Sequence, residues 1–253
     1  MAVYAVGDVH GQADALKLLI QKLELQSDDH IIFLGDYVDR GPDWFEAVKY
    51  ITELESICQV TALWGNHDVL MYDSLKLFND CEICPDIGSE EKQQIWFYNG
   101  GRETYNKFVG LSAVDKQFTA DFFGKLQVDI DLSVNDREYT LCHSLPGKIS
   151  GSLWDAVWAR LSWNKQGKIY CDSKIDVTAL FENYKNRTII HGHTPVFNYI
   201  DLSSDEQIGA FKYNLGDVAF IDIDLAAGSI GRFDGANICA LRLDDMREFY
   251  GIE

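Results

Sequence analysis

The stretch GDYVDRGP, residues 35–42, follows directly on the apolar run IIFL, residues 31–34. An apolar run of this length predicts a buried strand, and the glycine and proline predict a sharp turn at its end. The turn carries two carboxylates and a guanidinium, from Asp36, Asp39 and Arg40. A solvent-exposed turn does not require this concentration of charge. Partners for these side chains are therefore expected elsewhere in the chain.

Polar, glycine-rich motifs also follow other predicted strands. Helices alternate with the early strands, which predicts an α/β fold with a mixed sheet system and flanking helices. In such folds, functional residues gather just past the carboxyl ends of strands. The predicted strands cover residues 3–6, 31–34, 60–64, 139–142, 188–190, 219–224 and 238–243, and the predicted helices cover 13–25, 44–54, 69–78, 90–98 and 114–126. The motifs are GDVHG (7–11), GDYVDRG (35–41), GNHD (65–68), His143 and HGHTP (191–195).

The composition favours one domain with a substantial core. Of 253 residues, 47% are hydrophobic, and the chain shows neither repeats nor a linker. We expect a single domain over residues 1–253, with a helical insert at about 73–135 where no strand motif occurs. The net charge of −18 argues against nucleic-acid and membrane partners, which need a positive surface. Six scattered cysteines and the lack of a signal peptide predict a cytoplasmic location.

Six oxygen and nitrogen donors lie directly after predicted strands. Carboxylate, amide and imidazole together suit borderline divalent metals, with manganese as the leading expectation and iron or zinc as alternatives. Two such ions about 3.5–4 Å apart can hold an attacking hydroxide between them and bind phosphoryl oxygens. Asp36 lies in the middle of the set and is the expected bridge. The predicted metal ligands are Asp8, His10, Asp36, Asn66, His143 and His193.

Three neighbouring side chains have the chemistry that a phosphoester hydrolase needs besides metals. His67 follows the predicted ligand Asn66, and its protonated imidazole could give a proton to the departing alkoxide. Asp39 is expected to orient that imidazole and to favour its charged form. Arg40 can grip a phosphate with its planar guanidinium. The stretch GDYVDRGP would thus supply a metal bridge, an orienting carboxylate and a phosphate clamp.

Each of these residues also has a purely structural interpretation. A single aspartate after a strand, such as Asp8 or Asp36, is usually a turn residue or a helix cap. We interpret His191 as a structural histidine, although it stands next to the HGHTP glycine. Cys81 and Cys84 form a lone CxxC without a second pair, which does not predict a zinc or redox site. The functional interpretation rests on the joint occurrence of five motifs at strand ends.

The order of these motifs resembles that of the calcineurin-like metallophosphoesterases, and GDYVDRG is similar to the PPP-type serine/threonine protein phosphatases. NGG at 99–101 with Thr104 resembles the bacterial and bacteriophage lambda branch, as does the segment from IDID (221–224) to LRL (241–243). The resemblance implies a four-layer αββα sandwich of two mixed β-sheets flanked by helices. It assigns Asp8, His10 and Asp36 to one metal, and Asp36, Asn66, His143 and His193 to the other.

The resemblance also suggests a second phosphate arginine, Arg160, because VWAR at 157–160 is similar to a segment of the phage-type enzymes. A surface helix arginine is the alternative interpretation. Trp64 and Asp68 stand where the family commonly has arginine and glutamate, which leaves the shape of the site and the substrate class open. The GNHD spelling also occurs in the related symmetric dinucleoside tetraphosphate hydrolases, although these do not usually carry DYVDRG.

Together these features predict a metal-dependent phosphomonoester hydrolase. The leading expectation is a protein serine/threonine phosphatase that uses a metal-bridging hydroxide in one step, without a covalent phosphoenzyme. Its partner would be a phosphorylated protein or a small phosphoester, and the oligomeric state stays open. A symmetric dinucleoside tetraphosphate hydrolase, or another nucleotide phosphohydrolase, is the alternative enzyme. A non-catalytic phosphoprotein-binding module on the same fold is a further alternative, disfavoured because the ligands, His67 and Arg40 are all present.

Overall fold

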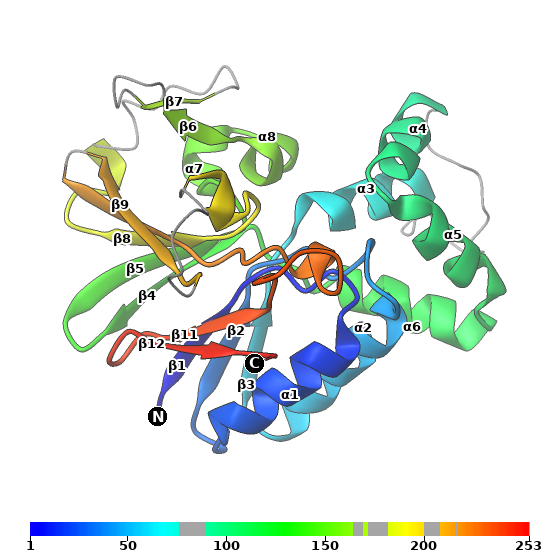
Figure 1. Ribbon diagram of the computed structural model, residues 1–253, viewed down its shortest axis with the longest axis horizontal. Helices are drawn as coiled ribbons and strands as arrows, with labels where there is room; N and C mark the ends of the chain where they lie inside the picture. Colours follow the sequence, from blue (N-terminus) through cyan, green and yellow to red (C-terminus); the bar gives the residue numbers. More distant parts are fainter. Residues whose placement is uncertain (76–89, 164–168, 172–181, 200–207, 216, 253) are drawn as a thin grey trace.

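The computed structural model of the chain describes residues 1–75, 90–163, 169–171, 182–199, 208–215 and 217–252. Two five-stranded sheets, each with parallel and antiparallel neighbours, form the centre of the molecule (Figure 1). The first sheet has the order β12-β11-β1-β2-β3, with bounds Arg247–Tyr250, Cys239–Arg242, Val3–Val6, His30–Phe33 and Gln59–Ala62. The second has the order β4-β5-β8-β10-β9, with bounds Asp129–Val134, Arg137–Cys142, Thr188–His191, Val218–Asp222 and Phe211–Leu215. A separate two-stranded sheet pairs β6 (Leu161–Trp163) with β7 (Ile169–Cys171).

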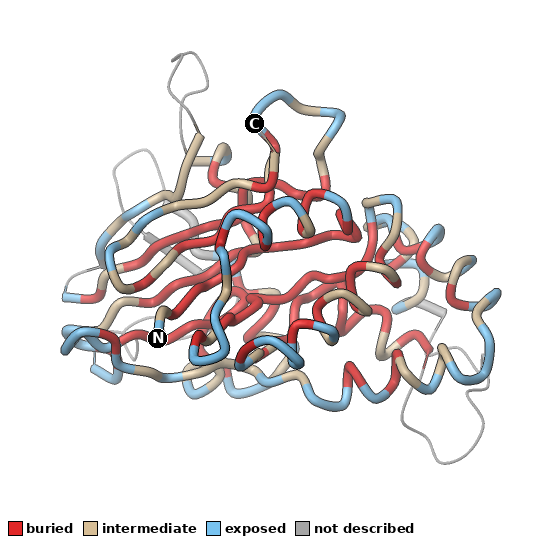
Figure 2. The backbone as a smooth tube through the Cα atoms, turned by 90° about the horizontal axis from the view of Figure 1, so that it is seen from below, coloured by how far each residue is buried: buried red, intermediate tan, exposed pale blue. Residues whose placement is uncertain are grey.

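Strand β1 shows how the sequence builds the layers. All four of its residues are buried. Tyr4 and Val6 belong to the core shared with the helices, whereas Val3 and Ala5 belong to the core shared with the second sheet. Because successive side chains of a strand point to opposite faces, β1 is covered on both sides. Figure 2 shows the strands as two buried layers at the centre of the molecule.

The second sheet is covered in the same way. Ile190 and Ile221 contribute to the core between the sheets, and their neighbours Ile189 and Phe220 pack in a third core on the outer face. The expected arrangement of two mixed sheets with flanking helices is therefore confirmed. Among the described residues, no helix combines the length and the apolar character needed to cross a bilayer.

Helices α1 and α2 cover the first sheet, and α2 begins where Asp43 accepts a hydrogen bond from the Glu46 backbone N–H at 2.8 Å. The predicted helix at 90–98 is found with those bounds. The helix expected at 69–78 begins earlier, at Asn66, and residues 76–89 lie outside the described part. The helices are α1 (Ala13–Leu23), α2 (Trp44–Glu53), α3 (Asn66–Leu75), α4 (Glu90–Tyr98), α5 (Gly101–Gly110), α6 (Ala113–Phe123), α7 (Gly147–Ser150) and α8 (Leu153–Trp158), with short 3₁₀ turns η1 (Leu54–Ser56), η2 (Val196–Asn198) and η3 (Ala227–Ser229).

The helical insert expected at about 73–135 requires a correction at its end. Residues Asp129–Val134 form strand β4, which pairs with β5 in a hairpin. The turn between them is formed by Asn135 and Asp136, whose φ angles are 49° and 61°. Positive φ at both central residues is typical of the two-residue turns that join antiparallel strands. The helical part described here therefore ends with α6, and α4 to α6 stand beside α3 at one side of the molecule (Figure 1).

Candidate metal centre and active site

The loops after β1, β2, β3, β5 and β8 converge at the carboxyl ends of the parallel strands of both sheets. This is the place where α/β folds gather functional side chains, because parallel strands present their ends on one side. Five of the predicted ligands are almost completely buried, and His193 is half-buried. The structure brings all six together: Asp8, His10, Asp36, Asn66, His143 and His193.

Asp36 lies at the centre of this group. Its Oδ2 atom is 3.5 Å from Nε2 of His10, and its Oδ1 atom is 3.6 Å from Nε2 of His143. Two clusters of potential metal-binding atoms, each with its atoms within 4.8 Å of one another, share this residue. One cluster adds His10 and His67, and the other adds Asp8 and His143. The Asp36 carboxylate thus faces two groups of donors, as a bridging ligand must.

Asn66 links the remaining donors to the centre. Its side-chain Oδ1 lies 2.9 Å from Nε2 of His143 and 2.9 Å from Nδ1 of His193. The backbone N–H of His193 donates to Oδ1 of Asp8 at 3.2 Å, which connects the loop after β8 to the loop after β1. Two loops from the second sheet and one helix N-terminus from the first sheet therefore meet at a single amide oxygen.

In two of the histidines, a hydrogen bond to a backbone carbonyl determines which ring nitrogen lacks a hydrogen and can bind a metal. Nδ1 of His10 lies 3.0 Å from the Val38 carbonyl oxygen, and Nδ1 of His143 lies 3.0 Å from that of Leu34. Because a carbonyl oxygen only accepts, Nδ1 carries the hydrogen and Nε2 of each neutral ring keeps a lone pair. Both lone pairs face the Asp36 carboxylate. Nε2 of His10 is also 3.1 Å from the Arg40 guanidinium, whereas among the described residues Nε2 of His143 faces only oxygen acceptors, of Asp36 at 3.6 Å and Asn66 at 2.9 Å. A divalent cation between the His143 ring and these oxygens would remove their mutual repulsion, so the donor set fits such an ion.

The electrostatics of the buried donors agree with this requirement. Burial, followed by repulsion from Asp224 and Asp36, raises the pKa of Asp8, and burial likewise raises the pKa of Asp36. Burial also lowers the pKa of His10, and it lowers the pKa of His193 to about 3, with a further contribution from Arg160. Imidazoles therefore stay neutral, which is the form that binds metals, and the carboxylates need a cation to remain charged at this depth.

Backbone strain concentrates at the same loops. Among the described residues, eleven non-glycine residues have a positive φ, and five of them are predicted site residues: His10, Asp36, Asp39, Arg40 and His193. A positive φ costs free energy for residues with a Cβ and is found where surrounding structure enforces it. At Gly65, an added Cβ would overlap Oδ1 of Asp36. Only glycine at this position lets the loop after β3 approach the central carboxylate.

His67, Asp39 and Arg40 form a connected group beside the metal ligands. Nδ1 of His67 is 2.7 Å from Oδ2 of Asp39, and both side chains are buried. The guanidinium of Arg40 lies 2.8 Å from Nε2 of His67 and 3.1 Å from Nε2 of His10, so it spans both groups. Burial and then Arg40 lower the pKa of His67, while burial raises the pKa of Asp39 to about 7. A phosphate dianion held by Arg40 would offset the effect of that arginine on His67.

Two further residues considered in the sequence, Arg160 and His191, precede or follow the donors of the second sheet in the chain. Arg160 follows α8 and is exposed, and its positive charge contributes to the lowered pKa of His193. His191 is buried between the carbonyl of Gly192 at 3.0 Å and the hydroxyl of Tyr213 at 2.9 Å. Both ring nitrogens of His191 are used in these hydrogen bonds, which agrees with its interpretation as a structural histidine.

Asp68 has a role that sequence reasoning did not identify. Its buried carboxylate accepts backbone N–H groups from Asp36 at 2.8 Å, from Tyr37 at 3.0 Å and from Gly65 at 2.9 Å. These bonds join the loop after β2 to the loop after β3. Burial raises the pKa of Asp68 to about 7, and the three N–H groups oppose that rise. The short acid in place of the usual glutamate therefore holds two ligand loops together.

We expect Asp68→Ala to lower the free energy of unfolding by about 4 kcal/mol, because three buried N–H groups lose their acceptor. Urea denaturation of the metal-free chain measures this loss. Asp73→Ala is the matched control on the same helix, because the side-chain contact given for Asp73 within the described residues is an exposed ion pair with Lys92. It should cost less than about 1 kcal/mol. Equal losses in the two variants would contradict the structural role of Asp68.

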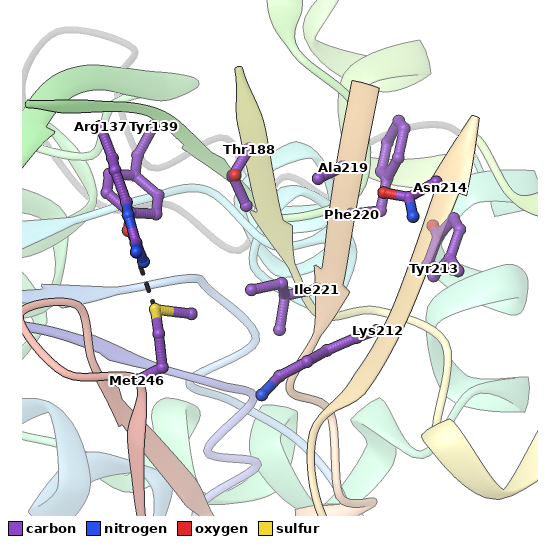
Figure 3. A pocket seen from close by; sticks show the side chains of 10 residues that line it. All are labelled: Arg137, Tyr139, Thr188, Lys212, Tyr213, Asn214, Ala219, Phe220, Ile221 and Met246. Atoms are coloured by element: carbon purple, nitrogen blue, oxygen red, sulfur yellow. Dashed lines mark hydrogen bonds between the residues drawn. The ribbon is translucent and has the colours of Figure 1, made fainter. Parts of the chain in front are cut away.

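The structure also contains a pocket of about 350 Å³ that none of the predicted site residues lines (Figure 3). Its lining includes Arg137 and Thr188, the first residues of β5 and β8. His143 and His193 follow the last residues of these strands. The pocket therefore lies at the opposite end of the second sheet from the candidate metal centre, and we assign it no part in catalysis.

The sequence of the chain is similar to those of known proteins. A family model described as calcineurin-like phosphoesterase matches residues 1–197. Two symmetrical bis(5'-nucleosyl)-tetraphosphatases match over 70 residues: that of Salmonella paratyphi A is 40% identical, and that of Buchnera aphidicola is 36% identical. The matched part is 27% of this chain, and it spans only about a quarter of the length of these curated relatives, 24% and 25% respectively.

The arrangement of the chain is also found in solved structures. A crystal structure of a candidate diadenosine tetraphosphatase aligns with a TM-score of 0.57 over 98% of this chain and 92% of that chain, at 16% sequence identity. A metallophosphoesterase from Sphaerobacter thermophilus aligns with a TM-score of 0.52 over 99% of this chain and 86% of that chain, also at 16% identity. At this level of identity, the similarity shows a shared fold.

Proposed function

Because the chain belongs to the calcineurin-like phosphoesterase family, we propose that it hydrolyses phosphate monoesters at two divalent metal ions. Phosphoserine and phosphothreonine side chains are the proposed substrates, and manganese is the proposed metal. When bound, the ions would activate water and neutralise the phosphoryl oxygens. Asp8, His10 and Asp36 would hold one ion, and Asp36, Asn66, His143 and His193 would hold the other.

The chain's own residues would bind the phosphate and move a proton. Arg40, which lies between His10 and His67, would hold two phosphoryl oxygens with its guanidinium. Arg160 would contact the phosphate from the side of His193. In this structure Nε2 of His67 accepts from Arg40, so Arg40 would first turn to the phosphate and Nε2 would take up a proton from solvent. As the bond from phosphorus to the leaving oxygen breaks, Nε2 of His67 would give that proton to the leaving oxygen. Asp39, bound to Nδ1 of the same ring, would hold it in place and stabilise its positive charge.

The pair formed by His67 and Asp39 carries the proposal on substrate class. An alkoxide leaving from serine or threonine is strongly basic and gains greatly from a proton donor, whereas a nucleoside diphosphate is a good leaving group without one. The 2.7 Å contact between the buried Nδ1 and Oδ2 is the geometry of an oriented acid. A site that maintains such a buried pair is suited to esters with poor leaving groups.

A second candidate is the symmetric hydrolysis of dinucleoside tetraphosphates. The curated relatives, which match this chain over 70 residues, are named symmetrical bis(5'-nucleosyl)-tetraphosphatases. In addition, the Trp158 ring lies 6.3 Å from the His193 ring and 5.2 Å from the Trp154 ring, which is 37% exposed. Exposed aromatic faces beside a phosphate site can stack nucleobases. These two tryptophans on α8 favour a nucleotide substrate.

The two candidates are separated by kinetics on both substrates with the same manganese-loaded protein. We expect a higher kcat/KM for release of phosphate from phosphoserine and phosphothreonine peptides than for cleavage of diadenosine tetraphosphate. A higher kcat/KM on the dinucleotide, with ADP as the only product, would replace the first proposal by the second. Trp154→Ala serves as the discriminating variant, because it should impair only the nucleotide reaction. Activity that survives complete removal of metal would contradict both proposals.

A further inference from the structure

The indole of Trp96 binds the carboxylate of the proposed acid pair. Its Nε1–H lies 3.0 Å from Oδ2 and 3.2 Å from Oδ1 of Asp39, and the Trp96 side chain is completely buried. Oδ2 of Asp39 is also the atom that contacts Nδ1 of His67 at 2.7 Å. Trp96 belongs to α4, 57 residues away from Asp39 in the chain. A helix outside the two sheets thus reaches the proton-donating pair.

Helix α5 holds the same aspartate from another side. The backbone N–H of Asp39 donates to Oγ1 of Thr104 at 3.2 Å, and Thr104 is buried. Hydrogen bonding with Thr104 and with the Trp96 indole opposes the rise in the pKa of Asp39. The Trp96 indole and the His67 ring both contact the Asp39 carboxylate directly. The carboxylate cannot rotate about its side chain without losing at least one of these contacts.

The corner between α4 and α5 is shaped for this contact. A Cβ added at Gly101 would overlap the indole nitrogen of Trp96. Gly100, with φ of 105°, turns the chain beside Arg40, and a Cβ there would lie 3.4 Å from the Arg40 Cγ atom. Gly101 therefore leaves room for the indole of Trp96, and Gly100 lets the chain turn from α4 into α5 beside Arg40.

We propose that Trp96 is a positioning residue, which holds the Asp39 carboxylate so that His67 points its proton at the leaving oxygen. The proposal rests on the function of His67 as proton donor. In this proposal, helices α4 and α5 hold Asp39 in place through Trp96 and Thr104. Gly101 is part of the same device because it leaves room for the indole. Trp96 is also packed against the rings of Phe97 and Tyr105. Loss of packing alone would affect all substrates equally, whereas loss of positioning would not.

The kinetic test uses Trp96→Phe, which removes the indole N–H and keeps an aromatic ring. With the manganese-loaded chain, kcat on a phosphothreonine peptide should fall about tenfold, and kcat on 4-nitrophenyl phosphate should stay within about threefold of the unaltered chain. KM should stay unchanged on both substrates. Gly101→Ala should give the same selective loss, because it displaces the indole from Asp39.

Two control variants match these changes. Trp44 is also buried, and its Nε1 has no hydrogen-bond partner among the described residues. Trp44→Phe therefore makes the same reduction in side-chain size as Trp96→Phe without removing a hydrogen bond. Gly110 is in the same helix as Gly101, and an added Cβ there would meet no described atom within 4 Å. Trp44→Phe and Gly110→Ala should leave the ratio of the two kcat values unchanged.

A spectroscopic measurement tests the contact without turnover. In the metal-free chain, the indole ¹H–¹⁵N signal that disappears in Trp96→Phe should shift on Asp39→Asn and on Gly101→Ala, and stay in place on Gly110→Ala. Equal kinetic losses on both substrates, or an indole signal insensitive to Asp39→Asn, would overturn the positioning role. In that case a selective loss in His67→Asn would still support the proposed function. Equal losses in His67→Asn would overturn the proton-donor role and the positioning role together.

Discussion

Asp36→Asn is expected to lower kcat on every phosphomonoester by at least about a thousandfold, because one substitution weakens both proposed metal sites. The two carboxylate oxygens of Asp36 face His10 on one side and His143 on the other, at 3.5 and 3.6 Å. Asparagine keeps one carbonyl oxygen and loses the negative charge that two cations would share. Steady-state kinetics during titration with manganese, together with metal analysis of the dialysed protein, measures the effect.

The substitution should leave the fold intact, which makes its result interpretable. Oδ1 of Asp36 accepts the backbone N–H of His67 at 2.9 Å, and the carbonyl oxygen of asparagine can accept the same bond. Asp14→Asn is the matched control, because Asp14 is exposed in the first turn of α1. It should retain full activity and two bound ions. If Asp36→Asn also retained two ions and more than about a tenth of kcat, Asp36 would not be a shared ligand.

Elements with strong burial on a regular period could be predicted from the sequence. Strand β1 was predicted with its observed bounds because each of its four residues is apolar and buried. Strand β4 was missed because its residues are mostly half-buried or exposed and its hairpin turn is Asn135-Asp136 instead of a glycine turn. Helix α5 was missed as a helix because it starts at Gly101, and glycine disfavours helices. The close contact with Trp96, which no local pattern encodes, requires glycine at position 101.

The same distinction applies to the candidate site. The predicted ligands follow strand ends, so their convergence follows from the topology of parallel strands. The carboxylate of Asp224 also lies near these ligands and raises the pKa of Asp8, but only the packing of β10 places it there. Trp96 has the character of a core residue in the sequence, and only its distance to Asp39 reveals a polar role. Site residues that directly follow a strand could be predicted from the sequence. Site residues that reach the site only through tertiary packing, such as Trp96, could not.

His67→Asn is expected to slow hydrolysis of phosphothreonine peptides by about a thousandfold and that of 4-nitrophenyl phosphate by less than about tenfold. Asparagine cannot deliver a proton to the leaving oxygen, and a threonine alkoxide needs that proton far more than a nitrophenolate does. The measurement is kcat for a series of phosphomonoesters whose leaving groups differ in basicity. A plot of log kcat against leaving-group pKa should be steeper for the variant than for the unaltered chain.

The steepness of that plot distinguishes loss of the acid from loss of metal. Asn66, the residue before His67, is a proposed ligand, so a disturbed loop would reduce metal binding and slow all esters alike. Excess manganese would then restore the variant, whereas it cannot restore a missing proton donor. His30→Asn is the matched control. His30 is the first residue of β2, so it lies away from the strand ends that carry the ligands, and its ring hydrogen-bonds to the hydroxyl of Thr61 in β3. A parallel plot for His67→Asn at saturating manganese would refute the assignment of His67 as the acid.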